Sequence, residues 1–293
     1  MTTKLLPSLM VLIMSNIVGN HTTAMSAERK DAVERPAIVL VAFGTSNAEA
    51  RKVFDHIDAA ARKRFPQHEI HWAFTSAFIR AKLKNQGIEL KSPDEVVQQL
   101  RQAGQQRVVF QSLHVAPGQE YEEIRQVDTS GLQTAVGGAL LADADDIRAV
   151  AAALKSEIQQ DAANVVVCHG NESHPKFNRQ LIAIAGVIEA RHDNVVVCSI
   201  NGQPGTDKLA DAKREAATSG RVNFIPLMVV AGVHVAEDIL GDDVGSWKSI
   251  VGAKVATCTK PLGYNDQVLA VYFEHLDEAL ATLKTQPQTG DRP

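Results

Sequence analysis

The sequence alternates between short apolar runs rich in β-branched residues and longer amphipathic segments, and this alternation constrains the fold more than any other feature. Apolar runs bounded by turn residues are typical of buried strands, and apolar residues at helical spacing are typical of helices. Strands that alternate with helices predict parallel sheets that helices cover on both faces. The predicted strands cover residues 37–43, 70–74, 108–113, 136–141, 164–168, 195–198, 222–230 and 254–258, and the predicted helices cover residues 48–64, 93–103, 118–127, 145–160, 175–190, 206–217 and 267–284.

The chain divides into two halves that echo each other weakly. Residues 39–44 open the first predicted sheet with an apolar run that ends in Phe-Gly, and residues 165–170 open the second with a run that ends in Cys-His-Gly. We therefore predict an α/β protein with two similar domains, each a roughly four-stranded parallel sheet flanked by helices. The predicted domains span residues 28–145 and 146–293, and the last helix is expected to pack back on the first domain.

Composition narrows the functional class. Of the 293 residues, 45% are hydrophobic and 22% are charged, which is the balance of a globular protein. The formal net charge of -4 argues against nucleic-acid binding, which normally needs a basic face. Cys168, Cys198 and Cys258 lie in or beside apolar runs and are interpreted as small core residues, although a disulfide between two of them is also compatible with the sequence.

Residues 1–27 have the pattern of a secretory signal peptide. Lys4 provides a single positive charge, residues 5–18 are mostly apolar, and small residues follow up to Ala24 and Ala27. The apolar run is shorter than the roughly 20 residues that a membrane-spanning helix needs, so we expect cleavage, with an uncleaved anchor as the alternative. The expected location is the periplasm.

Chemistry-bearing residues gather where the predicted strands end. Ligands of open α/β sheets bind beyond the carboxyl ends of the strands, so these positions are the candidates for a site. Three of the six ends carry a histidine, more than we expect by chance from ten histidines. The ends are Gly44-Thr45-Ser46, Thr75-Ser76, His114, Cys168-His169-Gly170, Asn201-Gly202-Gln203 and Ala231-Gly232-Val233-His234.

His169 and His234 are the leading candidates for metal ligands. His169 lies between a buried strand and Gly170, which predicts a side chain at the mouth of the sheet, although a core histidine bonded to backbone fits the same pattern. Glu237 and Asp238 follow His234 and suit either a helix N-terminus or a carboxylate that orients the histidine. Imidazole together with carboxylate suits Zn, Co, Fe or Ni.

His114 and Glu120 form a second candidate group. Pro117 and Gly118 indicate a turn after His114, and Glu120 then falls on the first turn of a helix near the strand end. The residues alone therefore predict that two or three imidazoles and a carboxylate converge on one cleft.

The loop after the first strand has two interpretations. Its backbone N–H groups suit an anion, because residues 44–46 precede a predicted helix. A simple helix N-cap at Thr45 or Ser46 explains the same residues.

At this point the chain resembles a known family, the anaerobic sirohydrochlorin cobaltochelatases, which are class II tetrapyrrole chelatases similar in fold to ferrochelatase. The resemblance covers residues 37–283, and its motifs occur in order. They are Phe43-Gly44-Thr45-Ser46, Ala73-Phe74-Thr75-Ser76, Gln111-Ser112-Leu113-His114 with Glu120-Tyr121-Glu122, His169-Gly170, and the segments 226–234 and 242–248.

The resemblance implies an enzyme that inserts Co²⁺, and in related members also Fe²⁺, into sirohydrochlorin without ATP during cobalamin biosynthesis. It implies that His169 and His234 hold the metal and that Glu120 is the active-site glutamate, as a proton acceptor or third ligand. We expect imidazoles from both halves to meet across one gap wide enough for a flat ring. Arg80 and Lys82 either attract the polycarboxylate substrate or are ordinary surface charges.

Two departures from the family pattern bear on function. After the sixth predicted strand the family carries an acidic residue followed by Tyr-Pro, whereas this chain has Asn201-Gly202-Gln203-Pro204. The metal affinity or preference of this chain is therefore expected to differ from that of the family at this position. The leader is the second departure, because cobalamin synthesis is expected in the cytoplasm. It motivates an alternative hypothesis: an exported haem or tetrapyrrole carrier with His114 as axial ligand. We also expect a homo-oligomer.

Overall fold

The computed structural model describes residues 35–285. The predicted signal peptide at residues 1–27 lies outside these residues, and so does the polar tail after residue 285. Within the described range, every helix is too short or too polar to cross a membrane.

The first half is built on a four-stranded parallel sheet with the order β2-β1-β3-β4. β1 is central and all six of its residues are buried, as expected for a strand covered on both faces. The strands are β1 (Ala37–Ala42), β2 (Ile70–Phe74), β3 (Arg107–Ser112) and β4 (Gln133–Gly137).

The second half repeats this arrangement with the order β6-β5-β7-β8, again entirely parallel. β5 takes the place of β1 and is likewise buried along its whole length. The predicted fold class, two similar parallel α/β sheets, is confirmed. The strands are β5 (Ala163–Cys168), β6 (Val195–Ser199), β7 (Arg221–Pro226) and β8 (Val255–Cys258).

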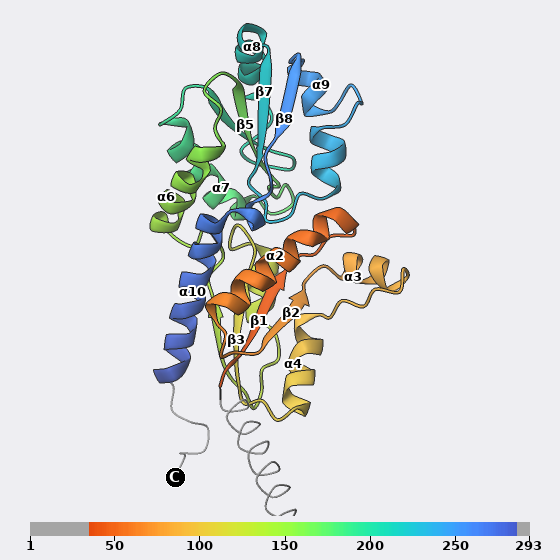
Figure 1. The fold of residues 1–293 in the computed structure, drawn as a ribbon, viewed down its shortest axis with the longest axis vertical. Coiled ribbons are helices and arrows are strands. Elements are labelled where there is room, and N and C mark those ends of the chain that lie inside the picture. The colour runs from red at the N-terminus through yellow and green to blue at the C-terminus, as the bar shows by residue number, and fades with distance from the viewer. Residues whose placement is uncertain (1–34, 286–293) are drawn as a thin grey trace, which may run out of the picture.

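Helices cover the sheets, and the two halves lie end to end along the long axis (Figure 1). The helix α10 (Asp266–Thr285) leaves the second half and runs along β3 and β4 of the first half. The largest apolar cluster includes residues of both sheets and of α10, so the halves share one core. The other helices are α2 (Ala48–Arg64), α3 (Ala77–Lys84), α4 (Pro93–Gln102), α5 (Gln119–Arg125), α6 (Ala144–Ala153), α7 (Arg179–Glu189), α8 (Leu209–Ser219) and α9 (Trp247–Val251), with short turns η1 (Leu154–Glu157), η2 (Pro175–Asn178), η3 (Val235–Ile239) and η4 (Leu262–Tyr264).

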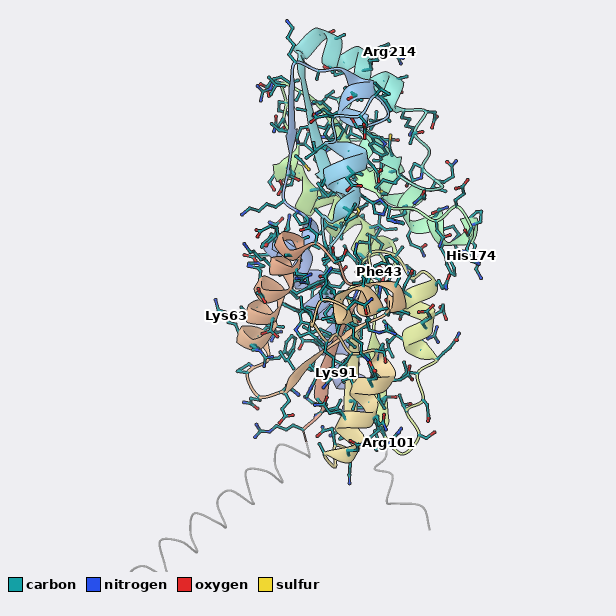
Figure 2. The ribbon with its side chains drawn as sticks, turned by 90° about the vertical axis from the view of Figure 1, so that its right-hand side faces the viewer. Phe43, Lys63, Lys91, Arg101, His174 and Arg214 are labelled. Atoms are coloured by element: carbon teal, nitrogen blue, oxygen red, sulfur yellow. The ribbon has the colours of Figure 1, made fainter. Side chains whose placement is uncertain are left out.

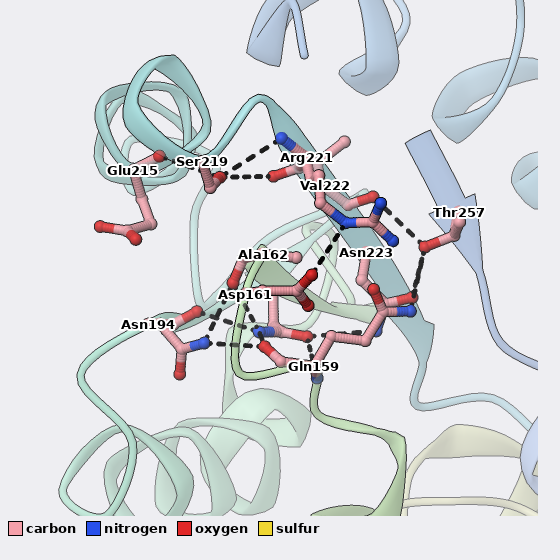
Figure 3. A network of polar contacts seen from close by, with 11 residues as sticks. Gln159, Asp161, Ala162, Asn194, Glu215, Ser219, Arg221, Val222, Asn223 and Thr257 are labelled. Atoms are coloured by element: carbon pink, nitrogen blue, oxygen red, sulfur yellow. Dashed lines mark hydrogen bonds and ion pairs between the residues drawn. The ribbon is translucent and has the colours of Figure 1, made fainter. Parts of the chain in front are cut away.

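A buried polar network closes the amino end of the second sheet (Figure 3). Asn164 and Asn223 are buried on adjacent strands, and the Asn223 Nδ2 atom donates to Asn164 Oδ1 at 3.1 Å. Thr257 on β8 donates to Asn223 Oδ1 at 2.9 Å. This network satisfies polar groups at the end of the sheet opposite to the loops after β5 and β7.

Some expected elements are placed differently. The fourth strand was expected at residues 136–141 but ends at Gly137. Leu140 and Leu141 are buried outside the sheet, where their N–H groups donate to the carbonyls of His114 and Val115. The helix expected at residues 145–160 ends at Ala153 and continues as the 3₁₀ turn η1. The helices α3 and α9 are too short to show a helical period in the sequence.

The three cysteines are free, so no disulfide forms among them. Cys168 and Cys198 are buried in different core clusters, on opposite faces of the second sheet. Burial raises the pKa of both thiols to about 12, which keeps them protonated. This agrees with their interpretation as small core residues.

Candidate functional site

His169 directly follows the central buried strand β5, and its side chain is exposed. The next residue, Gly170, has φ +72°, and a Cβ there would overlap the carbonyl oxygen of Asn201. The loops after β5 and β6 therefore pack backbone to backbone, and the Asn201 N–H donates to the His169 carbonyl at 2.8 Å. Because the His169 side chain is exposed at the end of the strand, His169 is not a core histidine.

The loop that follows His169 is held by a residue that the sequence did not single out. Asn178 is buried, and its side chain accepts from the N–H of Asn171 and donates to the Asn171 carbonyl, both at 2.7 Å. The signal in the sequence was weak, because a lone asparagine before a helix usually indicates a cap.

His234 lies at the start of η3, beyond the end of β7, and is exposed. Its Nδ1 atom lies 2.6 Å from Oδ2 of Asp238, one turn further along η3. Of the two acidic residues in this turn, Asp238 is thus the one that orients the imidazole. A carboxylate on Nδ1 favours the tautomer whose Nε2 lone pair faces outward.

The imidazoles of His169 and His234 lie edge to face, with ring centroids 5.1 Å apart and an interplanar angle of 77°. The Nδ1 atom of His169 lies 2.9 Å from the carbonyl of Gly170, so both rings have Nδ1 engaged. Neither Nε2 atom has a hydrogen-bond partner among the described residues. The expectation that imidazoles from the two halves would meet is wrong for this pair, because β5 and β7 belong to the same sheet.

Glu120 lies in the first turn of α5, as expected, and is partly buried. Across residues 35–285, no group of three or more His, Cys, Asp or Glu side chains is placed to hold a metal ion. The histidine pair and Glu120 therefore do not form an assembled three-ligand site, and the role of Glu120 stays a prediction.

His114 follows β3 and is more enclosed than the other two histidines. Its Nδ1 atom lies 3.0 Å from the Ser112 hydroxyl and its Nε2 atom 3.4 Å from the Thr75 hydroxyl. Burial lowers the pKa of His114 to about 4, so the ring is neutral at pH 7. It makes no ring contact with His169 or His234 among the described residues. Haem ligation by His114 stays a prediction, and it would require Nε2 to leave Thr75.

The two halves meet closely where the loop after β1 faces the loop before His234. A Cβ at Gly232 would lie 3.1 Å from the Thr45 hydroxyl oxygen. Thr45 itself is buried, and its hydroxyl accepts from the Asn47 N–H at 3.2 Å. The N-cap of α2 is Asn47, not Thr45 or Ser46 as expected, because the Asn47 side chain accepts from the Ala50 N–H.

The family model for cobalt chelatases, described as CbiK, matches residues 36–281. The chain belongs to this cobalt chelatase family. By family it is a metal chelatase, which is a lyase. The recognition from sequence motifs is thereby confirmed.

Two curated relatives of this cobalt chelatase are similar over most of their length. One is the sirohydrochlorin cobaltochelatase CbiKC of Nitratidesulfovibrio vulgaris strain Hildenborough, 30% identical over 85% of this chain and 92% of the relative. Another is the sirohydrochlorin cobaltochelatase of Salmonella typhimurium strain LT2, 32% identical over 84% of this chain and 97% of the relative.

Solved structures support the fold of this cobalt chelatase. SirB from Bacillus subtilis with Fe³⁺ aligns with a TM-score of 0.59 and 14% identity, over 86% of this chain and 98% of that one. CbiX, described as the terminal enzyme of sirohaem biosynthesis in denitrifying bacteria, aligns with a TM-score of 0.52 and 17% identity, over 83% and 99%. At this identity the likeness concerns the fold alone.

Proposed function

We propose that this cobalt chelatase inserts Co²⁺ into sirohydrochlorin without ATP, with His169 and His234 presenting the metal. The observation that carries the proposal is the pair of adjacent imidazoles, with ring centroids 5.1 Å apart, in the segments that follow β5 and β7. The names of the curated relatives support the choice of metal and macrocycle.

The chemistry of the pair suits a metal that must be released. Neutral imidazole is a ligand for Co²⁺ and Fe²⁺, and two ligands leave most coordination positions open for pyrrole nitrogens. Because Nδ1 of each ring is engaged by Gly170 or Asp238, each ring offers Nε2 without first changing tautomer. The pair thus binds the ion on one side and leaves the opposite side for the macrocycle.

Insertion also requires that two pyrrole N–H protons leave the macrocycle as the dication enters. We propose Glu120 as the acceptor. Its carboxylate is partly buried in the first turn of α5, and it takes part in no hydrogen bond or ion pair with another described side chain. A carboxylate without a competing partner is free to accept a proton.

Apolar side chains lie on both sides of the junction between the halves. Phe43 is 48% exposed at the end of β1 and lies near the level where the halves meet (Figure 2). Val233, 41% exposed, separates Gly232 from His234. We propose that these two side chains supply apolar surface on which a flat macrocycle can pack.

The test is an optical assay with purified protein, Co²⁺ and metal-free sirohydrochlorin. We expect conversion to the cobalt spectrum well above the uncatalysed rate, and loss of that excess in the His169→Ala plus His234→Ala variant. No excess in the wild type, or full activity in the double variant, contradicts the proposal. Parallel reactions with Fe²⁺ measure the metal preference, and we propose that Fe²⁺ is also accepted.

We further propose that the protein is exported to the periplasm and self-associates. The signal-like pattern of residues 1–27 supports export. Cell fractionation and the N-terminal sequence of the purified chain test export, and sedimentation tests self-association. An unprocessed chain in the cytoplasmic fraction, or a monomer at all concentrations, contradicts the respective proposal.

A further inference from the structure

We propose that Arg51 and Arg80 bind the carboxylate arms of the tetrapyrrole at the rim of the first half. This inference deepens the proposed function and rests on it, since it assigns the residues that recognise the acidic periphery of the same substrate. The argument stands on how the two guanidinium groups are held and on where their loops lie.

Arg80 is fixed at the carboxyl end of β2. From the first turn of α3, its Nη1 atom donates to the carbonyls of Phe74 and Thr75, at 2.5 and 2.8 Å. These two bonds use one nitrogen of the planar fork, and no described residue accepts from Nη2 or Nε. An arginine held in this way keeps donors that suit a carboxylate, at little further loss of side-chain freedom.

Arg51 is held in the same manner at the end of β1. From α2, its Nη1 atom donates to the carbonyl of Ser46 at 3.0 Å, and its other guanidinium nitrogens have no described acceptor. β1 and β2 are neighbouring strands, so the two arginines follow adjacent strand ends. The loop after β1 packs against the end of β2 and against α3, because a Cβ at Gly44 would lie 3.3 Å from both Cδ1 of Phe74 and Cγ2 of Ile79.

Both tethering loops also approach candidate site residues or the segments beside them. The Thr75 hydroxyl lies 3.4 Å from Nε2 of His114. Thr45, beside Ser46, makes the close approach to Gly232, two residues before His234. Arg51 is thus anchored on the loop that approaches the segment before His234, and Arg80 on the segment that contacts His114.

Nearby acids do not neutralise the pair. Glu95 is the acid whose field reaches Arg80, but its Oε2 atom accepts from the Ser92 N–H at 2.6 Å and it forms no ion pair with Arg80. Glu49, near Arg51 along α2, is paired with Lys52 at 2.6 Å. Lys82 is exposed and has no such tether, so the structure separates it from Arg80.

The test compares Arg51→Gln and Arg80→Gln with a matched control, Arg101→Gln. The Nη2 atom of Arg101 also donates to two carbonyls, those of Asp128 and Ser130, but Arg101 lies at the far end of the first half (Figure 2). All three variants lose one charge, and they lose hydrogen bonds to one backbone carbonyl in Arg51→Gln and to two in Arg80→Gln and Arg101→Gln. Only Arg51→Gln and Arg80→Gln remove a guanidinium group that is proposed to bind a carboxylate of the substrate.

Each rim variant is expected to raise the KM for sirohydrochlorin roughly tenfold, the loss of one charge-assisted hydrogen bond, with kcat and Co²⁺ affinity near wild type. Arg80→Lys keeps the charge and is expected to recover part of the loss, and raising the salt concentration is expected to narrow the difference. The control is expected to keep the wild-type KM. Melting temperatures compare the folds.

Unchanged KM in both rim variants overturns the inference, as does an equal rise in Arg101→Gln. Fluorescence quenching of metal-free sirohydrochlorin separates this result from a failure of the proposed function, because it measures binding without insertion. Arginine-dependent binding without cobalt insertion supports the rim and contradicts the chelatase. Cobalt insertion together with binding that does not depend on the two arginines supports the chelatase and contradicts the role of Arg51 and Arg80.

Discussion

The Nδ1 atom of His234 and the Oδ2 atom of Asp238 lie 2.6 Å apart across one turn of η3. This contact leaves the Nε2 atom of His234 without a described partner, and the same holds for its neighbour His169, whose own Nδ1 atom is engaged by the Gly170 carbonyl. A carboxylate engages Nδ1 of His234 and a backbone carbonyl engages Nδ1 of His169, so Nε2 is the nitrogen left open on both rings.

We predict that Asp238→Asn weakens Co²⁺ binding by about 10- to 100-fold, the range for loss of a carboxylate that orients a metal-bound histidine. The neighbouring variant Glu237→Gln is the control. This substitution removes the same charge from the same turn, and the Glu237 side chain makes no hydrogen bond with His234. Titration with Co²⁺ measures both. Equal affinities in the two variants would mean that Asp238 contributes charge alone.

A second prediction concerns His114 and pH. The pKa of His114 in the folded chain is about 4, below the usual 6.5. Between pH 4 and pH 6.5 the unfolded chain therefore binds a proton at this residue that the folded chain does not bind. The free energy of unfolding therefore keeps its full value above pH 6.5 and decreases as the pH falls toward 4. The decrease amounts to at most about 3 kcal/mol, and less because the ring is partly exposed.

Urea unfolding of the wild type and of His114→Gln across this window measures the effect. We expect the wild type to lose more unfolding free energy than the variant as the pH is lowered, since glutamine does not titrate. Parallel curves for the two proteins would contradict the lowered pKa.

The close approach of Gly232 and Thr45 predicts a compensating pair of substitutions. In Gly232→Ala, the new Cβ lies 3.1 Å from the Thr45 hydroxyl oxygen, so the Thr45 side chain or the segment before His234 must shift by a few tenths of an ångström. Thr45→Ala removes that oxygen and leaves the Thr45 Cβ at 4.0 Å, an ordinary contact. We expect lower cobalt insertion in Gly232→Ala and recovery in the double variant. A double variant worse than either single one would show that the contact does not limit activity.

The buried network of the second sheet predicts a change in stability without a change in chemistry. Asn164 and Asn194 both donate to the carbonyls of Gln159 and Ala162, but Asn164 is buried and also accepts from Asn223. We expect Asn164→Ala to lower the free energy of unfolding by about 3 kcal/mol, because it leaves buried polar groups without partners. We expect Asn194→Ala to lower it by about 1 kcal/mol, because Asn194 is only partly buried and water can replace its side chain. Urea unfolding measures both, and cobalt insertion per folded molecule should stay at the wild-type level.

Much of the fold could be predicted from local patterns. The bounds of α2 and β2 agree with the prediction, because a helical period and a short apolar run each end at clear turn residues. β4 was misplaced because Leu140 and Leu141 extend the apolar run beyond the sheet, and burial outside a strand leaves the same pattern as burial within one.

The site was predictable in its residue types more than in its geometry. Three histidines at strand ends indicated a metal site, and Asp238 was one of two acids expected to serve His234. The approach of Thr45 to Gly232 could not be predicted, because it joins residues far apart in the sequence and depends on how the halves pack. The two imidazoles were expected from different halves, whereas strand order brings them together within one sheet.

The central claim is that His169 and His234 hold one Co²⁺ ion together. X-ray absorption of the purified protein loaded with Co²⁺ counts imidazole ligands directly, with His192→Ala as the control for loss of a histidine at the other end of β6. The account predicts two imidazoles in the wild type and in the control, and one in His169→Ala and in His234→Ala. An imidazole count that stays the same when both are replaced would contradict it.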